Sequence, residues 1–222
     1  MMLYPLDLES RIATNIARIS TRLRIEVMAL EVERIEGVVI IANGTPDDIA
    51  FSIISHHSDG EITVGIAKPR ERTGIGVIDV LPSYAKAGRI MVLMDQEDRN
   101  IQDIFSEARK KLINAGFRVI KEVEEEMLKI YHCQFAGRSV VVVLVVNGLD
   151  EIQTEKHTVE DHLLRAAEVF GIEIGNFENS KDAWRRMRNY HEEIFVKLKK
   201  SREIEEIFPQ QFRGCEYLKR IS

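Results

Sequence analysis

The stretch RIMVLMDQED, residues 89–98, decides the fold of this chain. Its apolar run from Arg89 to Met94 predicts a buried strand, and residues 100–114 continue with a helical pattern. A strand that leads directly into a helix is the repeating unit of a parallel α/β sheet. Three acidic residues mark the junction of the two elements: Asp95, Glu97 and Asp98.

The same alternation extends in both directions. Segments rich in β-branched residues predict further strands at 38–42, 61–67, 117–123, 127–134 and 139–146, the last two joined by a hairpin turn at 136–138. Helices are expected at 46–57, 158–170 and 180–207. Residues 68–88 are expected to form a loop with a short helix, and the residues after 207 an irregular tail. This order favours an α/β fold with a mostly parallel central sheet flanked by helices.

The chain divides into three regions: residues 1–36, an α/β core at 37–148, and a C-terminal helical extension at 149–222 that packs on the core. In the first region, apolar residues recur every three or four positions: Leu8, Ile12, Ile16, Ile19, Leu23, Val27 and Leu30. This stripe predicts a long N-terminal helix. A homodimer formed through residues 7–36 and packing of the helix on its own domain both explain the stripe.

Composition excludes several classes of protein. A hydrophobic fraction of 45% in 222 residues suffices for a core without metal or disulfide support. Cys133 and Cys215 match no zinc-binding spacing, and no apolar run is long enough to cross a membrane. We therefore expect a cytoplasmic protein without a membrane partner. The net charge of −5 disfavours attraction of the whole molecule to nucleic acid, so any such surface must be local.

The acidic residues that follow the strand at 89–94 suit a hard divalent cation. Asp95 and Glu97 lie two positions apart, so in an extended segment their carboxylates point the same way and can share Mg²⁺, with Asp98 as a third ligand. The competing explanation is that these residues only stabilise the start of the next helix. Ligands bind at the carboxyl ends of parallel strands, which places Asn43 and Gly44 on the same rim.

At this point the chain resembles a Toprim domain, the metal-dependent module of topoisomerases, bacterial primases, recombination proteins and overcoming-lysogenization-defect nucleases. That family has a strand ending in glutamate and glycine, and a later strand ending in Asp-x-Asp. The corresponding segments here are Ala42-Asn43-Gly44-Thr45-Pro46-Asp47 and Asp95-Gln96-Glu97. The resemblance covers roughly residues 36–146. It implies a Toprim-like fold, Mg²⁺ or Mn²⁺ as cofactor, and a nucleic acid or a nucleotide as partner.

Two departures from the family pattern weaken the prediction of catalysis. Asn43 stands where the family has a glutamate that acts as general acid or base, and an asparagine amide does not exchange a proton near neutral pH. Glu97 replaces the second aspartate, although it can still bind a metal. Small archaeal Toprim-like proteins of unknown function carry a Glu-Asp pair at the start of a helix, and Glu160-Asp161 in HTVEDHLL looks similar. This pair could supply the absent carboxylate if its helix reaches the rim.

A basic segment in the C-terminal third is a candidate for phosphate contact. Residues 181–202 hold eight Lys or Arg against three Asp or Glu, with Trp184 and Tyr190 interleaved. The alternative is an ordinary solvated helix face. The candidate phosphate or nucleic-acid contacts are Gly44, Asp47, Arg185, Arg186 and Arg188.

Three hypotheses follow from these residues. The leading one is a Toprim-like magnesium-binding protein that binds nucleic acid or a nucleotide, with weak or no nuclease activity. The second is an active metal-dependent phosphodiesterase or nuclease in which Glu160, Asp161 or Asp47 replaces the missing glutamate. The third is a non-enzymatic dimeric scaffold.

Overall fold

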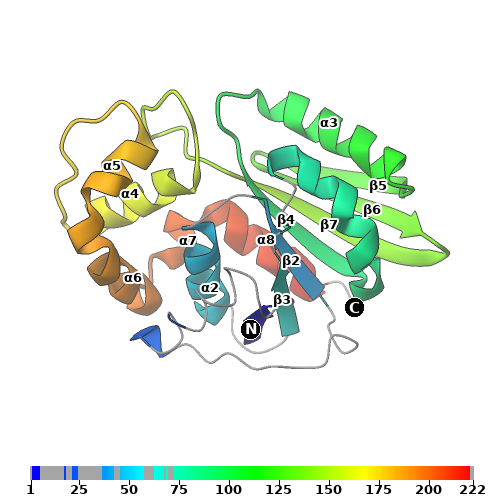
Figure 1. Ribbon diagram of the computed structural model, residues 1–222, viewed down its shortest axis with the longest axis horizontal. Helices are drawn as coiled ribbons and strands as arrows, with labels where there is room; N and C mark the ends of the chain where they lie inside the picture. Colours follow the sequence, from blue (N-terminus) through cyan, green and yellow to red (C-terminus); the bar gives the residue numbers. More distant parts are fainter. Residues whose placement is uncertain are drawn as a thin grey trace.

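A computed structural model of the chain describes residues 2–5, 18, 22–24, 37–42, 46–57, 63–67, 69 and 73–220. These residues form one sheet of seven strands in the order β1-β3-β2-β4-β7-β6-β5 (Figure 1). The strands are β1 (Met2–Pro5), β2 (Gly37–Ile41), β3 (Thr63–Ala67), β4 (Arg89–Asp95), β5 (Arg118–Glu125), β6 (Leu128–Phe135) and β7 (Arg138–Asn147). The α/β class expected from the sequence is confirmed.

The sheet is mixed, with its parallel part first in strand order. The pairs β1–β3, β3–β2, β2–β4 and β4–β7 are parallel, whereas β7–β6 and β6–β5 are antiparallel. The hairpin predicted between β6 and β7 is confirmed, with Phe135 opposite Arg138. Ala136 and Gly137 both have positive φ, 48° and 78°, which is the conformation of a two-residue turn that matches strand twist.

Helices cover both faces of the sheet. They are α2 (Asp47–His57), the 3₁₀ helix η2 (Gly74–Ala87), α3 (Ile101–Asn114), α4 (Val159–Val169), α5 (Ser180–Arg186), the 3₁₀ turn η3 (Arg188–Tyr190), α6 (His191–Lys200), α7 (Ile204–Ile207) and α8 (Pro209–Arg220). Alternate residues of each strand face opposite ways, so Ile90 and Val92 pack with η2 and α3, whereas Met91 and Leu93 pack with α2, α4, α6 and α8.

The prediction of an irregular C-terminal tail is wrong, because residues 209–220 form helix α8. Pro209 is the first residue of this helix, a position where its missing N–H group costs nothing. Gly214 lies against the sheet, and a Cβ atom there would be 2.7 Å from Met91 Sδ and 2.8 Å from Val145 Cγ2. The glycine that we expected to interrupt structure therefore allows α8 to pack closely on β4 and β7.

Two other segments differ from their predictions. Residues 74–87 form one long 3₁₀ helix instead of a loop with a short helix, and it buries Val77, Ile78 and Leu81 against the sheet. Gly88, with φ of 70°, ends it. The helical stretch expected at 180–207 is helical but broken into α5, η3, α6 and α7.

The predicted N-terminal helix lies mostly outside the described residues. One residue of its apolar stripe, Leu23, is described and is 6% exposed within the core of its own chain. Its neighbour Arg22 forms an ion pair with Glu192 of α6. At this position the stripe therefore covers the chain's own core. In the described part of the chain, every helix is too short or too polar to cross a bilayer.

Candidate functional site

A cavity of about 710 Å³ lies at the carboxyl ends of the central strands. Four carboxylate residues line one part of it: Asp47, Asp95, Glu97 and Glu160. Basic side chains line another part: Arg18, Arg22, Lys181, Arg185, Arg188 and His191. We call the buried carboxylates Asp47, Asp95 and Glu160 the acidic floor, and the residues Lys181, Arg185 and Arg188 the basic wall.

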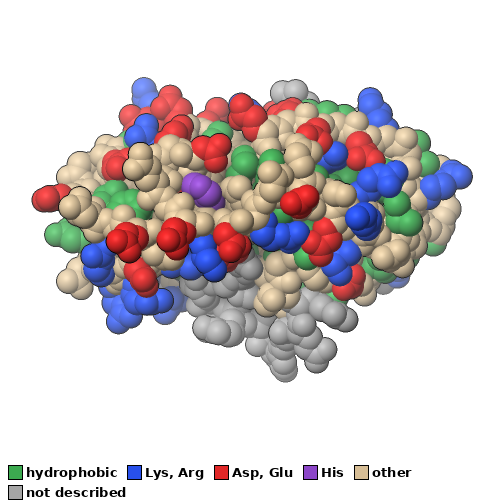
Figure 2. Space-filling view, turned by 90° about the horizontal axis from the view of Figure 1, so that it is seen from above, with side chains coloured by type: hydrophobic (Ala, Val, Ile, Leu, Met, Phe, Trp, Pro, Cys, Tyr) green, Lys and Arg blue, Asp and Glu red, His purple; other side chains and the backbone are tan. Residues whose placement is uncertain are grey.

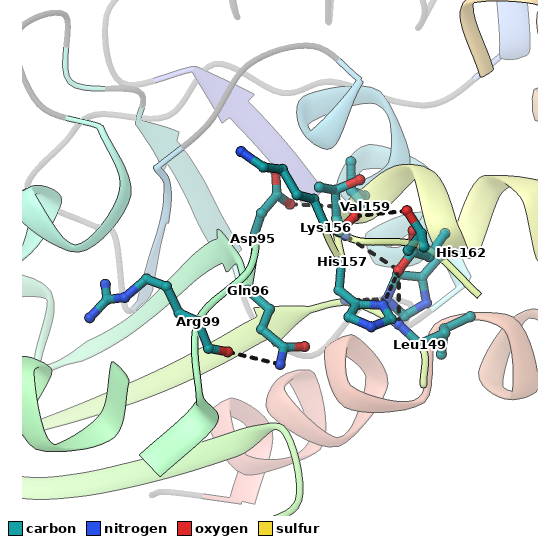
Figure 3. A network of polar contacts seen from close by, with 12 residues as sticks. Asp95, Gln96, Arg99, Leu149, Lys156, His157, Val159 and His162 are labelled. Carbon is teal, nitrogen blue, oxygen red and sulfur yellow. Dashed lines mark hydrogen bonds and ion pairs between the residues drawn. The ribbon is translucent and has the colours of Figure 1, made fainter. Parts of the chain in front are cut away.

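Asp95, the last residue of β4, is buried at the centre of the acidic floor. Its Oδ1 accepts hydrogen bonds from the backbone N–H of Val159 at 3.0 Å and from Asn147 Nδ2 at 3.1 Å (Figure 3). Val159 is the first residue of α4, so the positive end of that helix faces the carboxylate. The helix that begins after Thr158 therefore reaches the rim, as the hypothesis about Glu160 requires.

Asp47 joins the floor through a shared amide. It is the first residue of α2 and is 4% exposed, and its Oδ1 accepts a hydrogen bond from Asn147 Nδ2 at 3.0 Å. Asn147 ends β7 directly opposite Asp95 of β4, so one amide group holds both carboxylates. Burial, together with the negative charges of Asp95 and Glu160, raises the pKa of Asp47 well above its ordinary value.

Glu160 completes the floor from the first turn of α4. Its side chain is buried. Burial raises the pKa of Glu160, as does the charge of Asp95, whereas a hydrogen bond from the Thr158 side chain and the charge of Lys181 oppose the shift. Glu160 thus brings a third buried acidic group to the lining of the cavity.

Glu97 is held at the edge of the cavity by a strained backbone. Its φ of 58° is left-handed, a rare conformation for a residue with a side chain. Two backbone hydrogen bonds with His157, of 2.8 and 2.9 Å, keep it there. Its Oε1 accepts a hydrogen bond from Lys181 Nζ at 2.8 Å.

Lys181 links the acidic floor to the basic wall. Its Nζ lies 3.8 Å from Asp95 Oδ2 as well as 2.8 Å from Glu97 Oε1. Burial lowers the pKa of Lys181, but the hydrogen bond to Glu97 and the charges of Asp95, Glu97 and Glu160 outweigh it, so the pKa is raised. The side chain therefore carries a stable positive charge beside the carboxylates.

The remainder of the basic wall comes from the last turn of α5 and from η3. Arg185 is exposed and pairs with Asp182 at 2.9 Å, and Arg188 lies in η3. Behind them the rings of Trp184 and His191 stack with centroids 3.8 Å apart. This stack anchors the segment, because Trp184 is buried and its carbonyl accepts a hydrogen bond from His191 Nε2.

Several predicted site residues lie elsewhere. Asp98 is exposed in the turn after β4, and Arg186 donates to the carbonyl of Asn176; neither lines the cavity. Asp161 is buried within the start of α4, where its Oδ2 accepts from His157 Nδ1 at 2.9 Å and from the backbone N–H of Leu149 at 3.2 Å (Figure 3). Asn43 and Gly44 lie outside the described residues.

The carboxylates of the floor are suited to a cation without forming a finished metal site. Among the residues that the structure describes, no three His, Cys, Asp or Glu side chains converge as metal ligands. The carboxylate oxygens of Asp47, Asp95 and Glu160 are of the type that a hard cation prefers, although Asn147 Nδ2 already donates to one oxygen of Asp47 and one of Asp95. Binding there would require small movements of the side chains and of Lys181.

Sequence reasoning missed two residues of the site, Asn147 and Lys181. Asn147 had a signal, because a polar residue that ends a fully apolar strand points to the rim of the sheet. Lys181 belongs to the basic segment 181–202, but no sequence signal placed it beside the carboxylates, since its position depends on the way α5 folds back over the rim.

Fold and cavity together define an α/β protein with an anionic floor and a cationic wall at the carboxyl ends of its parallel strands. No family model, curated protein or solved structure matches the chain. Carboxylates attract cations and guanidinium groups attract anions, so the two sides of the cavity favour ligands of opposite charge.

Proposed function

We propose that this chain is a Toprim-like protein that binds Mg²⁺ or Mn²⁺ at the acidic floor and a phosphorylated ligand, a nucleotide or a nucleic acid end, at the basic wall. Asp95, Asp47 and Glu160 would hold the cation, with Glu97 at the edge. The observation that carries the proposal is that Asp47, Asp95 and Glu160 line one cavity, close enough for the charges of Asp95 and Glu160 to raise the pKa of Asp47.

The electrostatics of the floor favour a cation. Burial is the main reason that the pKa values of Asp47 and Glu160 are raised, and the negative charge of Asp95 raises both further. A divalent ion between the carboxylates would offset their negative charges, and carboxylate oxygens are ligands that Mg²⁺ prefers. When bound, such an ion polarises a phosphoryl oxygen and stabilises negative charge on it.

The basic wall supports a phosphate on the opposite side. Arg185 and Arg188 carry planar guanidinium groups that match phosphate oxygens in pairs. On the face seen in Figure 2, acidic and basic side chains are interspersed, so that face offers no continuous basic surface for a long duplex. A compact phosphorylated group that enters the cavity fits this distribution better.

An active phosphodiesterase is the second candidate, and Glu160 favours it. A general acid or base needs a pKa near the working pH, and burial raises the pKa of Glu160 in that direction. Glu160 and Asp47 line the cavity, so either could do what Asn43 cannot. This candidate predicts magnesium-dependent cleavage of single-stranded nucleic acid that Glu160→Gln abolishes.

Calorimetric titration with Mg²⁺ and Mn²⁺ tests the leading proposal. Wild-type protein should show saturable binding, Asp95→Asn should lose it, and the exposed control Asp98→Asn should keep it. Absence of binding in the wild type, or equal binding in Asp95→Asn, would contradict the proposal. The dimeric scaffold stays a separate prediction, which light scattering of the wild type checks.

A further inference from the structure

The arginines that line the cavity come from two segments that lie far apart in the sequence. Arg185 and Arg188 belong to the basic wall, and we call them the wall arginines. Arg18 and Arg22 also line the cavity, and we call them the N-terminal arginines. Guanidinium groups stay charged throughout the physiological pH range and bind phosphate oxygens in pairs. The cavity therefore presents two pairs of groups that suit an anion with several oxygens.

The two segments meet at the start of α6. Arg22 forms an ion pair with Glu192, the second residue of that helix. Arg188 lies in η3 directly before the helix. Burial lowers the pKa of His191, the first residue of α6, and the positive charge of Arg188 lowers it further, so Arg188 lies close to this ring. One arginine of each pair thus lies beside the same turn of α6.

Other contacts hold the N-terminal segment at this place. Leu23 is buried among the apolar residues of the core. Lys199 of α6 donates to the backbone carbonyls of Leu23 and Arg24. These contacts use an apolar side chain and the backbone, so they position the segment without the guanidinium group of Arg22.

The carboxylates that now pair with the arginines can be replaced at little cost. The side chains of Arg22 and Glu192 are 55% and 60% exposed. Those of Arg185 and Asp182 are 70% and 65% exposed. Ion pairs as exposed as these contribute less than about 1 kcal/mol each. A phosphate that carries more charge than one carboxylate would therefore compete well for both arginines.

We infer that the ligand of this cavity carries a diphosphate or a longer phosphoryl chain, which binds between the N-terminal arginines and the wall arginines. A terminal phosphoryl group offers three oxygens, whereas four guanidinium groups that each pair with two oxygens need more acceptors. A cavity of about 710 Å³ is large enough for a ligand of this kind. This inference rests on the proposed function for its phosphate and does not depend on a cation at the acidic floor.

Calorimetric titration with inorganic phosphate and pyrophosphate, in the presence of a chelator of divalent ions, tests the inference. Pyrophosphate should bind at least roughly tenfold more tightly than phosphate, because it reaches both pairs of arginines. Arg22→Gln and Arg188→Gln should each weaken pyrophosphate binding roughly tenfold. The matched controls Arg24→Gln and Arg186→Gln should keep it, because both side chains are exposed on the same two segments but do not line the cavity.

A second readout follows the N-terminal segment itself. A ligand that joins this segment to α5 and η3 should slow cleavage by trypsin after Arg24, detected by mass spectrometry. In Arg188→Gln the same concentration of pyrophosphate should give no protection. A ligand that contacts only the basic wall would not protect this bond, so unchanged cleavage of the wild type at saturating pyrophosphate would overturn the inference.

The outcomes separate this inference from the function on which it rests. Pyrophosphate binding that depends on both Arg22 and Arg188 supports the bridge between the segments. Titration with ADP then identifies the source of the diphosphate: binding as tight as that of pyrophosphate indicates a nucleotide, and weaker binding indicates an inorganic diphosphate.

Equal binding of phosphate and pyrophosphate, lost in Arg188→Gln and kept in Arg22→Gln, refutes the bridge and leaves a phosphate site at the basic wall. Equal losses in the variants and their matched controls also refute it, because they show attraction by overall charge alone. If the wild type binds none of these anions, the inference fails together with the phosphate part of the proposed function.

Discussion

The acidic floor and the basic wall of the cavity differ in the way the fold holds them. The floor is buried, and each of Asp47 and Asp95 is fixed by the Asn147 amide, whereas Arg185 on the wall is exposed and pairs with Asp182 of its own helix. Buried carboxylates cost stability that must be recovered from hydrogen bonds, whereas exposed guanidinium groups cost little. Substitutions in the floor should therefore change stability, and substitutions in the wall should change binding.

Loss of the Asn147 amide should have the largest effect. Asn147→Ala removes the donor to Asp47 and Asp95 and the acceptor of Gln211 Nε2, which leaves several buried polar groups without partners. We expect a loss of about 3 kcal/mol in the free energy of unfolding, measured with urea. The exposed control Asn189→Ala should stay within about 0.5 kcal/mol of the wild type. A loss below about 1 kcal/mol for Asn147→Ala would argue against the shared amide.

Low pH should destabilise the folded protein through His162, which lies on α4 two residues after Glu160. Burial lowers the pKa of His162 from 6.5 to about 4. Its ring is neutral in the folded protein, where Nδ1 donates to the Ile207 carbonyl and Nε2 accepts from the backbone N–H of Gly148. Between pH 6.5 and 4 the unfolded chain therefore binds a proton that the folded chain excludes. The contribution of neutral His162 to the free energy of unfolding is complete above pH 6.5 and is lost as the pH falls toward 4.

The free energy of unfolding should fall by about 3 kcal/mol as His162 loses this contribution. Urea unfolding at a series of pH values between 7 and 4 measures it, and His162→Gln should flatten the profile. If His162→Gln shows the same slope as the wild type, another group controls the acid response.

Asp47 should have the opposite effect on the pH dependence of stability: its ionisation destabilises the folded protein as the pH rises. Its pKa is raised above the ordinary 3.8, so the cost of its ionisation appears as the pH rises above that value. Asp47→Asn keeps an acceptor for Asn147 and should stabilise the metal-free protein at neutral pH by about 1 kcal/mol, while it weakens Mg²⁺ binding. A destabilised Asp47→Asn protein would show that this carboxylate is not strained by its neighbours.

Substitutions in the basic wall should have the smallest effect on the free energy of unfolding. Arg185→Ala should change the free energy of unfolding by less than about 0.5 kcal/mol, because the side chain is exposed. Binding of a nucleotide in the presence of Mg²⁺ should fall about tenfold, as expected for loss of one charged hydrogen bond. Arg186→Ala, which lies outside the cavity, is the control, and equal losses in the two variants would place the ligand elsewhere.

Local sequence patterns were sufficient for most elements of the described fold. The apolar run before Asp95 and the turn at Ala136-Gly137 appear as predicted, because each is set by neighbouring residues. Helix α8 could not be predicted in this way, since Pro209 and Gly214 normally interrupt structure. The role of Gly214 depends on two strands far away in the sequence.

The site was predictable only in part, for the same reason. The rule that ligands bind at the carboxyl ends of parallel strands located Asp95 correctly at the rim, whereas Asn43 and Gly44, which it placed on the same rim, lie outside the described residues. Glu160 reaches that rim because the start of α4 contacts Asp95 through the backbone N–H of Val159, and these two residues are 64 positions apart in the sequence. The place of Asn147 at the end of an apolar strand could be read from the sequence, but its contacts with Asp47 and Asp95, like those of Lys181, arise from tertiary packing.

The most direct test of the account is the stabilisation of Glu160→Gln by Mg²⁺, measured beside the wild type by urea unfolding. The wild type should gain about 2.7 kcal/mol when free Mg²⁺ is roughly a hundred times its dissociation constant. Glu160→Gln should gain far less at the same concentration, because the amide has no negative charge and one oxygen fewer than the carboxylate. An equal gain in both proteins, or none in either, would contradict a metal site on the acidic floor.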